Sequence, residues 1–553
     1  MTLTVLGINR TQDASICLLR GNSIVAMIAK ERLTRRKHHW GALGDFERFY
    51  VPSVPELRET PIDAIVECFS TQELSPHKEQ QYREELQRTL RLTPRTRFLR
   101  LSHHFAHLYS AYDPSGLEEA AVMVIDAQGS HLRNLNERWS SGVPDDPRLR
   151  EIMSFYRCRP DERTCLAKQA WDGTMSQVAG LGMFYYLLTQ TFFPGEGNEG
   201  KVMGLASYGC AERATTERLR VEDHQVSLSE WWKSSLVDAP VRYTLPADDE
   251  RFQQAADFAA AGQRAFEDAL VSVAHWLHQA SGLDQLCFAG GTALNCSANT
   301  RLLTDTPFQR LFIPPAPGDA GTALGCALYG MEQLTGVRSS IRWETDYLGP
   351  ASSGEALGRA GDIPPEWHRE RPARLWERVT ELLVSGRTVG LAQGRSESGP
   401  RALGHRSILA DPRRPEMKEH VNRDIKGREW FRPLAPVVAL EEAPTYFDLD
   451  GPCPFMQWTA LVRPEYREII PAVVHCDGTA RLQTVTPEQN PDLYHLLQLF
   501  RERTGIGVLL NTSFNGKDEP IVESAADALR CLKTTALDAV VLPPFIISKS
   551  VLD

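Results

Sequence analysis

The sequence predicts an α/β protein with two domains, and three observations support this. Apolar runs of strand length are followed by tight turns and helical segments in both halves of the chain. A chain of 553 residues with 42% hydrophobic composition can bury the cores of roughly two to four domains. Between residues 335 and 375 the apolar pattern gives way to Gly, Pro and Ser, as at a domain boundary. We therefore expect domains at residues 1–340 and 345–553.

The first domain begins with segments that have the composition of covered strands. "LTVLGIN" and "ASICLLRGNSIVAMIAKER" carry apolar residues on both faces, and the second contains a Gly21-Asn22 turn between two strands. We expect "LTVLGIN" to be a central strand. A later run, "EAAVMVIDAQGS", ends in Asp126, followed by Gly129 and Ser130. A carboxylate is thus expected at the C-terminal end of a strand, where the clefts of α/β proteins form.

The rest of the first domain supplies two glycine-rich segments. "EGKVMGLASYG" contains Lys201 and Gly204, and it is followed by a polar region at about 210–260 that we interpret as an insertion or cap. "DQLCFAGGTALNCSANTRL" predicts a strand, a turn at Gly290 and Gly291, and a helix. A double-glycine turn that opens a helix exposes backbone amides to an anion, although a tight structural turn has the same pattern.

The second domain is predicted to begin with a helix, "RLWERVTELLVSG", and a strand, "RTVGLAQG". Residues 394–433 are then rich in arginine, with Gly, Pro and apolar residues between the charges. Arginines on turns and strand ends can bind phosphate or carboxylate groups, and the alternative is a salt-bridged surface. Further along, "HCDGTARLQTV" supplies Arg481, and "GIGVLLNTSFNGKDEP" ends an apolar strand in polar side chains. We find no internal repeat in the sequence.

Composition argues against several classes of function. The formal net charge of -10 disfavours a general polyanion binder, because affinity for nucleic acids depends on Lys and Arg. The 11 cysteines include no Cys-x-x-Cys pair, which is typical of reduced thiols. The sequence has no leader-like start and no apolar run of membrane-spanning length. We therefore expect a soluble cytoplasmic protein.

The segment "LSHHFAHLYSAY" is a candidate source of metal ligands. If it is helical, His103 and His107 lie at i and i+4 on one face and can bind one ion, the alternative being hydrogen-bonded core histidines. Asp126 and Asp319, the latter in "PAPGDAGTALG", complete a set of two histidines and two carboxylates. Such a set suits Fe, Mn or Zn better than Ca or Mg. We expect His104 to point elsewhere, towards the substrate.

Taken in order, these segments resemble the O-carbamoyltransferases of the nodulation-factor, cephamycin and nebramycin type over nearly the full length of the chain. The motifs that carry the resemblance are "DASICLL", "KERLTRRKHH", "HHFAH", "EGKVMGLASYG", "AGGTALNC", "PGDAGTALG", "GPRALGHRSILADPR", "IKGREWFRPLAP", "DGTARLQTV" and "LLNTSFN". The resemblance implies an N-terminal domain with an actin-like ATPase fold, similar to that of tRNA-modifying metalloproteins. It also implies a C-terminal α/β domain similar to the enzymes that make threonylcarbamoyl-adenylate.

The resemblance also implies a reaction. Family members use ATP, with Mg²⁺, to convert carbamoyl phosphate to carbamoyl-adenylate and pyrophosphate, and then transfer the carbamoyl group to a hydroxyl with release of AMP. The expected partners are therefore carbamoyl phosphate, ATP and a hydroxylated small molecule, such as an antibiotic or another secondary metabolite. A nucleic-acid partner is not expected, and a homodimer is compatible with the pairing that is common in the family.

The resemblance assigns candidate residues to two sites. It places carbamoyl phosphate and the adenylate in the C-terminal domain, on Arg401, Lys426, Arg432, Arg481, Asn511 and Ser513. It places Fe²⁺, or another divalent transition metal, in the N-terminal domain, on His103, His107, Asp126 and Asp319. Near this metal it places a nucleotide, with the candidate binding residues Lys201, Gly204, Gly290, Gly291 and Asn295.

One position departs from the family pattern. Where relatives have His-Asp-Ala-Ser after the first strand, this chain has Gln12-Asp13-Ala14-Ser15, and Gln12 cannot act as a base near neutral pH. The histidine of the relatives is a candidate for positioning or deprotonating the acceptor hydroxyl. Here either Asp13 or His38 is expected to do this, or the activated adenylate makes strong base catalysis unnecessary. Lys37 matches the transfer-site lysine of the family and is a candidate for stabilising the developing oxyanion, the alternative being a surface charge.

Two alternative functions stay open at this point. Both expected domains resemble halves of the tRNA-threonylcarbamoylating machinery, so the chain is a candidate tRNA-modifying enzyme. Its negative net charge argues against this function. The other alternative is a non-catalytic ATP-binding regulator of the actin-like type, which leaves the arginine-rich segment without a role. A requirement for threonine and bicarbonate would support the first alternative, whereas AMP release would eliminate the second.

Overall fold

The computed structural model divides into two compact units. It describes residues 2–68, 76–139, 146–238, 243, 250–352, 363–449 and 451–552. Unit 1 consists of Met1–Thr34 and His38–Trp343, and unit 2 consists of Arg35–Lys37 and Glu344–Asp553. Across the described ranges, no helix is both long enough and apolar enough to cross a membrane.

The first sheet of unit 1 has the strand order β3-β2-β1-β4-β5. Its strands are β1 (Thr4–Asn9), β2 (Ser15–Arg20), β3 (Ser23–Ala29), β4 (Ile62–Cys68) and β5 (Leu92–Leu101). β1 is fully buried and central, as the sequence predicted, with β2 antiparallel on one side and β4 parallel on the other. The predicted turn at Gly21 joins β2 to β3, and its φ of +55° is one that glycine adopts without strain.

The second sheet of unit 1 repeats this topology. Its strands are β6 (Ala120–Ile125), β7 (Arg150–Arg159), β8 (Glu162–Trp171), β11 (Gln285–Ala289) and β12 (Arg310–Phe312). The order is β12-β11-β6-β7-β8. In both sheets the first strand is central, the first three strands form an antiparallel meander, and the last two strands run parallel to the first. This duplicated arrangement is that of the actin-like ATPase fold, and it confirms the expected fold class.

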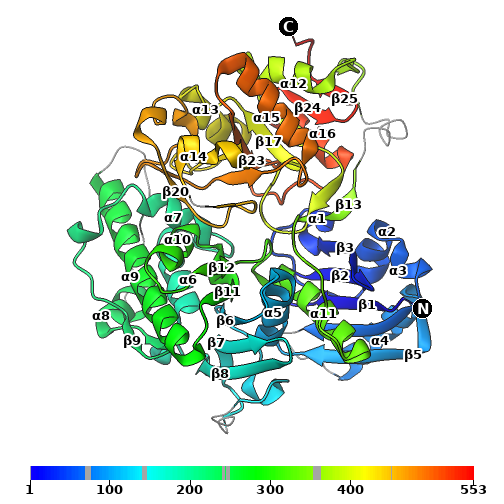
Figure 1. Ribbon diagram of the computed structural model, residues 1–553, viewed down its shortest axis with the longest axis vertical. Coiled ribbons are helices and arrows are strands. Elements are labelled where there is room, and N and C mark those ends of the chain that lie inside the picture. Colours follow the sequence, from blue (N-terminus) through cyan, green and yellow to red (C-terminus); the bar gives the residue numbers. More distant parts are fainter. Residues whose placement is uncertain are drawn as a thin grey trace. The chain divides into compact units, whose positions relative to one another are not determined.

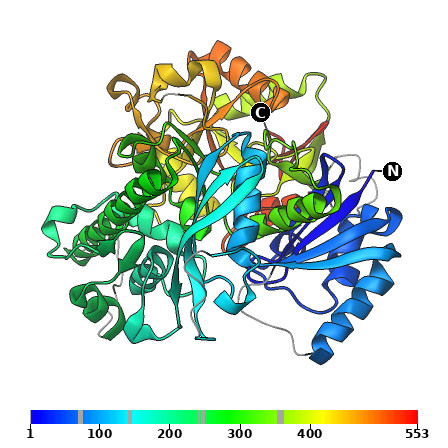
Figure 2. The same cartoon turned by 60° about the horizontal axis from the view of Figure 1, so that its bottom comes forward.

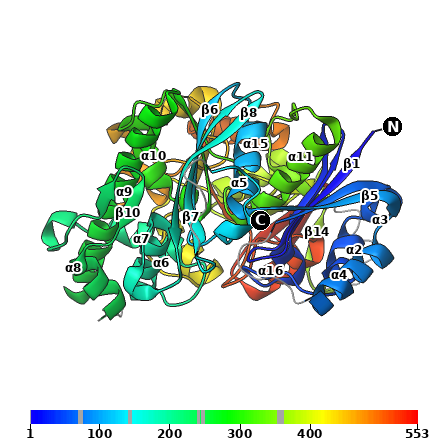
Figure 3. The same cartoon turned by 90° about the horizontal axis from the view of Figure 1, so that it is seen from below.

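Two helices lie between these sheets, as Figure 3 shows. α5 (His103–Tyr112) packs on β6 and β11, α11 (Thr322–Thr335) packs on β1 and β4, and the two helices pack against each other. Every residue of α5 is buried, as expected for a helix without a solvent face. A Cβ atom at Gly7 would lie 1.9 Å from the carbonyl oxygen of Ala323, so this close approach requires glycine.

The outer faces of the two sheets carry the remaining helices. α2 (Val51–Ser53), α3 (Glu56–Glu59) and α4 (Pro76–Thr89) contribute to the apolar core on the first sheet. α6 (Leu181–Phe192), α7 (Glu199–Ala206) and the long α9 (Glu250–Ser281) form a layer beside the second sheet, with α9 green in Figure 2. The predicted insertion contains β9 (Arg220–Glu222), β10 (Gln225–Ser227), α8 (Glu230–Lys233) and the start of α9, while 239–242 and 244–249 lie outside the described residues.

Unit 2 contains an eight-stranded mixed sheet with the order β14-β25-β24-β15-β17-β23-β18-β22. Its strands are β14 (His368–Glu370), β15 (Val389–Ala392), β17 (Arg406–Ala410), β18 (Ala435–Ala439), β22 (Gln483–Val485), β23 (Val508–Ser513), β24 (Ala539–Leu542) and β25 (Phe545–Ser548). Apolar side chains from both faces form separate cores, one with α12 (Leu375–Val384) and α15 (Pro491–Thr504), the other with α16 (Ala525–Thr534), all labelled in Figure 1. The predicted first helix and strand of the second domain are α12 and β15.

The tripeptide Arg35–Lys37 belongs to unit 2, although it follows α1 (Lys30–Thr34) in the sequence. The Arg35 guanidinium donates hydrogen bonds to the backbone carbonyls of Pro520 and Ile521, both at 2.6 Å. It also lies 3.5 Å from the carboxylate of Asp527. Lys37, which the sequence analysis assigned to the first domain, therefore groups with the residues of unit 2.

Candidate functional site

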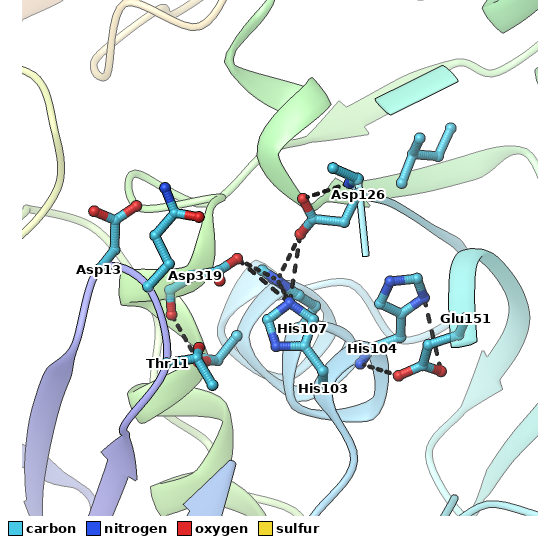
Figure 4. A network of polar contacts seen from close by, with 12 residues as sticks. Thr11, Asp13, His103, His104, His107, Asp126, Glu151 and Asp319 are labelled. Carbon is cyan, nitrogen blue, oxygen red and sulfur yellow. Dashed lines mark hydrogen bonds and ion pairs between the residues drawn. The ribbon is translucent and has the colours of Figure 1, made fainter. Parts of the chain in front are cut away.

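Two histidines and two aspartates converge between the sheets of unit 1, as Figure 4 shows. The Nε2 atoms of His103 and His107 lie 3.2 Å apart on α5. Asp126 Oδ2, directly after β6, lies 3.5 Å from His103 Nε2 and 3.3 Å from His107 Nε2. Asp319 Oδ1, just before α11, lies 3.3 Å and 3.7 Å from the same two atoms. The predicted helix α5, the end of β6 and the turn before α11 thus bring the four candidate ligands together.

These four side chains fit a divalent metal ion. Ligand atoms about 2.1 Å from one ion are separated by roughly 3.0–3.4 Å in octahedral or tetrahedral geometry, close to the observed spacing. Asp126 Oδ2 is buried and has no hydrogen-bond partner among the described residues, as expected of an oxygen atom that binds a cation. Both histidine side chains are 0% exposed, and the donor set of two imidazoles and two carboxylates suits Fe, Mn or Zn.

Opposite charges shift the pKa values of these groups strongly. Burial by itself lowers the pKa of His103, but the nearby Asp319 and other acidic groups raise it well above its usual value. Burial raises the pKa of Asp126, whereas the adjacent imidazoles of His103 and His107 lower it below its usual value. Without a cation the group therefore holds protons on its histidines, and a metal must displace them.

One of the two candidate histidine ligands is oriented by a thiol. His103 Nδ1 lies 3.5 Å from the buried Sγ of Cys68, at the end of β4, so that its Nε2 faces the two carboxylates. The residues that orient metal-binding histidines in this way influence metal affinity. His107 Nδ1, by contrast, is buried without a hydrogen-bond partner in the described part of the chain.

His104 does not face a substrate site, which corrects the expectation from the sequence. Its side chain is 0% exposed, and its Nδ1 lies 2.7 Å from Ser154 Oγ on β7. A helix turns each successive residue by about 100°, so the residue after His103 points away from the face that carries His103 and His107. Burial and the nearby Lys168 hold the pKa of His104 well below its usual value, so it is neutral.

The two candidates for the missing base form a pair. Asp13 Oδ1 lies 2.9 Å from His38 Nδ1, and the backbone N–H of His38 donates to Glu31 Oε2 at 3.1 Å. Burial raises the pKa of Asp13, and the hydrogen bond from His38 only partly opposes this rise. Burial lowers the pKa of His38, but Asp13 and Glu31 reverse this and raise it to about 9. The raised pKa of His38 favours a protonated imidazole at neutral pH, which donates a hydrogen bond to Asp13.

Asn9 connects this pair to the metal ligands. Its side-chain amide donates to the backbone carbonyls of Gln12 at 3.0 Å, of Asp13 at 3.1 Å and of Asp319 at 3.1 Å. Ser15 Oγ donates to the carbonyl of Ala320 at 2.8 Å. The loop that holds Gln12 and Asp13 is therefore fixed to the loop that holds Asp319, and the acidic side chain of Asp13 lies beside this loop in Figure 4.

The candidate nucleotide residues divide into two groups. A Cβ at Gly290 would lie 2.2 Å from the carbonyl oxygen of Ile125, and one at Gly291 would lie 3.1 Å from Asp126 Oδ1, so the double-glycine turn passes beside the metal ligand. The side chain of Asn295 instead caps α10 (Cys296–Thr304) and forms a hydrogen bond with Gln263. Both contacts are made within the protein. Lys201 and Gly204 lie within α7, where Lys201 Nζ is 5.5 Å from the centre of the Phe193 ring.

The candidate anion residues of unit 2 lie at one end of the central strands. Lys426 Nζ donates to Ser513 Oγ at 2.9 Å, and it also contacts the Ser513 carbonyl and Asn515 Oδ1. Asn511 donates to the Ala402 carbonyl at 3.1 Å and to Gln483 Oε1 at 2.7 Å. Arg401 is half-buried in the bend directly before Ala402. Strand β23 thus brings Asn511 and Ser513 to residues of the arginine-rich segment.

Like charges accumulate in this part of unit 2. Burial and the neighbouring Arg432 and Arg481 hold the pKa of Arg428 well below its usual value, and burial also lowers that of Arg432. The pKa of Lys426 is lowered by burial, by the nearby Arg428 and, more weakly, by Lys37. The buried Nε of Arg481 has no hydrogen-bond partner among the described residues. Buried cations that disfavour one another are typical of an anion site.

Arg428 is a member of this group that the sequence analysis missed. It lies in the quoted motif "IKGREWFRPLAP", two positions after Lys426, and its Nε donates to Asn422 Oδ1 at 2.8 Å. Its place in an arginine-rich run was the available signal, but that run also contains arginines with structural roles. Arg406, for example, is fully buried and donates to the carbonyls of Gln393 and Glu523.

Comparisons with known proteins match both units. Residues 44–328 match the family model described as carbamoyltransferase N-terminus, and residues 380–549 match that described as carbamoyltransferase C-terminus. The chain is 35% identical to the nodulation protein NolO of Bradyrhizobium diazoefficiens over 461 residues, which cover 81% of this chain and 79% of that protein. It is 33% identical to the nodulation protein NolNO of Sinorhizobium fredii over 570 residues, which cover 97% and 79%.

Among solved structures, full-length HypF in its phosphate- and nucleotide-bound form is similar to this chain. The TM-score is 0.35 at 13% sequence identity, with coverage of 61% of this chain and 47% of that one. The strand orders of unit 1 remain the basis of its fold assignment.

Proposed function

Because the chain belongs to the carbamoyltransferase family and is an enzyme, we propose that it is an ATP-dependent O-carbamoyltransferase with one reaction in each unit. In unit 2, carbamoyl phosphate and Mg²⁺-ATP give carbamoyl-adenylate. For the atoms to balance, water releases phosphate from carbamoyl phosphate, the carbamate oxygen attacks the α-phosphorus of ATP, and pyrophosphate leaves. In unit 1, a hydroxyl of a small-molecule acceptor takes the carbamoyl group, and AMP leaves.

The observation that carries this proposal is that, in a chain of this family, one unit contains a group of cations and the other contains a set of candidate metal ligands. Unit 2 holds the buried cation Lys426 and the half-buried cations Arg428 and Arg432, which lower the pKa values of their neighbours. Unit 1 holds a set of ligands that fits a divalent metal, next to a carboxylate with a raised pKa. The first group suits polyphosphate substrates, and the second suits the transfer of an activated acyl group.

In the activation step, the cations of unit 2 neutralise the phosphates of ATP and carbamoyl phosphate. We propose that Arg432 and Arg481 bind phosphate oxygens, because one guanidinium group can donate two parallel hydrogen bonds to two oxygens of a phosphate. Lys426, held by Ser513 and Asn515, stabilises the charge that develops as pyrophosphate leaves. Arg401 and Asn511 complete the proposed site beside Ala402.

In the transfer step, we assign the metal to His103, His107, Asp126 and Asp319. When bound there, a divalent ion such as Fe²⁺ supplies Lewis-acid polarisation of a phosphate oxygen without a redox change. Asp13 removes the proton from the acceptor hydroxyl, and its raised pKa makes it a stronger base than an exposed carboxylate. His38, which keeps its proton at neutral pH, orients Asp13 and thereby replaces the function of the histidine that is absent at Gln12.

The proposed acceptors are hydroxylated small molecules such as antibiotics and other secondary metabolites. The test is to incubate the purified protein with ATP, Mg²⁺ and carbamoyl phosphate, with and without added Fe²⁺, and to measure AMP and pyrophosphate by chromatography. Hydroxylated natural products are added in parallel and screened by mass spectrometry for the gain of one carbamoyl group. We expect carbamoyl-phosphate-dependent AMP and a carbamoylated product, and nucleotide cleavage that required threonine and bicarbonate instead would contradict the proposal.

A further inference from the structure

The first turn of α5, which carries His103, is held by side chains from outside the helix. Ser102, its N-cap residue, makes no side-chain capping bond. Instead, the backbone N–H of His103 donates to Ser130 Oγ at 2.9 Å, and that of His104 donates to Glu151 Oε1 at 2.9 Å. Because the first N–H groups of a helix have no partner within it, the position of this turn depends on Ser130 and Glu151.

Glu151, at the start of β7, also holds the segment that follows Asp126. Its Oε1 accepts a second hydrogen bond from the backbone N–H of Ser130 at 3.2 Å. The backbone N–H of Gly129 donates to the Glu151 carbonyl at 2.7 Å, and that of Glu151 donates to the Ser130 carbonyl at 3.0 Å. One residue therefore connects the two chain segments that supply His103, His107 and Asp126, and Figure 4 shows its carboxylate beside His104.

Lys168 on β8 is the counter-charge of Glu151. Its Nζ lies 2.7 Å from Glu151 Oε2 and 2.6 Å from Glu137 Oε1, and it donates to Ser154 Oγ and Tyr156 OH at 2.9 Å each. The side chains of Lys168 and Glu151 are both 0% exposed. A buried charge requires a partner, and one lysine between two glutamates leaves an excess negative charge close to a site for a cation.

The proposed mechanism of carbamoyl transfer does not use this buried group. A buried ion pair is often no more stabilising than apolar residues of similar volume, so its presence calls for a role other than stability. The contacts of Glu151 supply one, because they end at backbone atoms of His104, next to His103, and of Gly129 and Ser130, in the segment that follows Asp126.

We propose that Glu151, with Lys168 as its counter-charge, is the positioning residue of the metal centre. It sets the separation between the first turn of α5 and the segment after Asp126, and thereby the separation of His103, His107 and Asp126. It acts through backbone N–H groups and touches none of the ligand atoms. The inference rests on the proposed metal site and goes beyond it by naming the pair that shapes the site.

Metal binding by the full-length protein tests this inference without the carbamoyl-transfer assay. The protein is stripped of metal with a chelator and titrated with Co²⁺ against a fluorescent competitor, while visible absorption reports the ligand geometry. The variants are Glu151→Gln, which keeps the shape and removes the charge, and Lys168→Met. The matched control is Arg163→Met, because Arg163 is also on β8 and pairs at 2.9 Å with buried Asp113 at the opposite end of α5.

We expect Glu151→Gln and Lys168→Met to bind Co²⁺ roughly 10 to 100 times more weakly than the parent, with an altered absorption spectrum. Arg163→Met should bind Co²⁺ as the parent does, although all three variants lose a buried charge. Parent-like affinity and spectrum in the first two variants would overturn the positioning role. A loss no larger than that of Arg163→Met would also overturn it, because it would reflect stability alone.

Ser130→Ala keeps the test decisive if the charge variants do not fold. This change removes only the hydroxyl that accepts the His103 N–H, and parent-like Co²⁺ binding would then overturn the inference. A parent protein that binds no Co²⁺ would overturn the inference and the metal assignment together. Carbamoyl-phosphate-dependent AMP formation, measured separately, would still report on the remainder of the proposed function.

Discussion

Asp13 and His38 are separated by 25 positions in the sequence, yet Asp13 Oδ1 lies 2.9 Å from His38 Nδ1. Both residues have a φ of +53°, a left-handed backbone that is uncommon for residues other than glycine. Their side chains are 29% and 30% exposed, so a substrate can reach them. Two strained turns thus bring a carboxylate and an imidazole together beside the loop of a candidate metal ligand.

Replacing Asp13 should separate the two reactions. Asp13→Asn keeps the shape but removes the base, so we expect carbamoyl transfer to fall by about 10²- to 10⁴-fold. Pyrophosphate formation from ATP and carbamoyl phosphate should stay at the parent level, because we assign that step to unit 2. Both rates are measured by chromatography, with Glu31→Gln as the control for loss of a nearby charge. Equal losses in both rates would show that Asp13 does not act in transfer.

The raised pKa of His38 predicts how stability depends on pH. Its pKa is about 9 in the folded protein and 6.5 without these neighbours, so the folded state binds the proton more tightly. The stabilisation is therefore complete below about pH 6.5 and is lost as the pH rises to about 9. Urea unfolding of the parent and of His38→Asn at several pH values should show a difference in the free energy of unfolding that shrinks over this range. A difference that grew with pH would contradict this prediction.

The metal assignment predicts one bound divalent ion per chain. A His103→Ala, His107→Ala double variant should lose this ion and carbamoyl transfer, while pyrophosphate formation from ATP and carbamoyl phosphate persists. Metal content is measured by elemental analysis, and His278→Ala on α9 is the control for loss of a histidine elsewhere. Since protons compete for the same histidines, the parent should also release its metal on acidification. Stoichiometric metal in the double variant would refute the assignment.

The Nε of Arg481 is buried and has no hydrogen-bond partner among the described residues, which predicts that ligand binding and stability conflict in unit 2. Arg481→Met removes a half-buried cation next to Arg428 and Arg432, so we expect a melting temperature no lower than that of the parent. Carbamoyl-phosphate-dependent AMP formation should be lost. Pyrophosphate at 100 times its Kd should stabilise the parent by about 2.7 kcal/mol, and the variant much less. Arg503→Met on the exposed side of α15 is the control, and equal stabilisation by pyrophosphate in Arg481→Met would exclude Arg481 from the anion site.

Gly290 should be required for the metal site through its backbone. A Cβ there would lie 2.2 Å from the carbonyl of Ile125, the residue before Asp126, and φ is +95°. We expect Gly290→Ala to destabilise the protein by about 1–3 kcal/mol and to weaken metal binding as Asp126 shifts. Gly282→Ala is a matched control, because φ there is +66° and no atom lies within 4 Å of its added Cβ. Chemical unfolding and metal titration of both variants test this, and equal effects would mean that backbone strain alone is responsible.

Local patterns were sufficient to predict many elements of the fold. The continuous apolar run of β1 and the turn at Gly21 depend on neighbours in the sequence, as does the helical spacing of His103 and His107. The duplication of the two sheets of unit 1 left no repeat in the sequence, because many different apolar residues can satisfy the same strand order. Arg428 was missed for a related reason, since an arginine in a basic run has the same local pattern whether it binds an anion or supports a loop.

By itself the sequence determined the fold class, the covered strands, the helix with two histidines on one face and the arginine-rich segment, because periodicity and residue type act over a few neighbouring positions. Only the tertiary structure decided which of these residues meet. It paired Asp13 with His38, turned His104 towards Ser154, used Asn295 as a helix cap and grouped Lys37 with unit 2. Such contacts depend on packing between segments that lie far apart in the chain, and the buried pair of Glu151 and Lys168 exists only after that packing is complete.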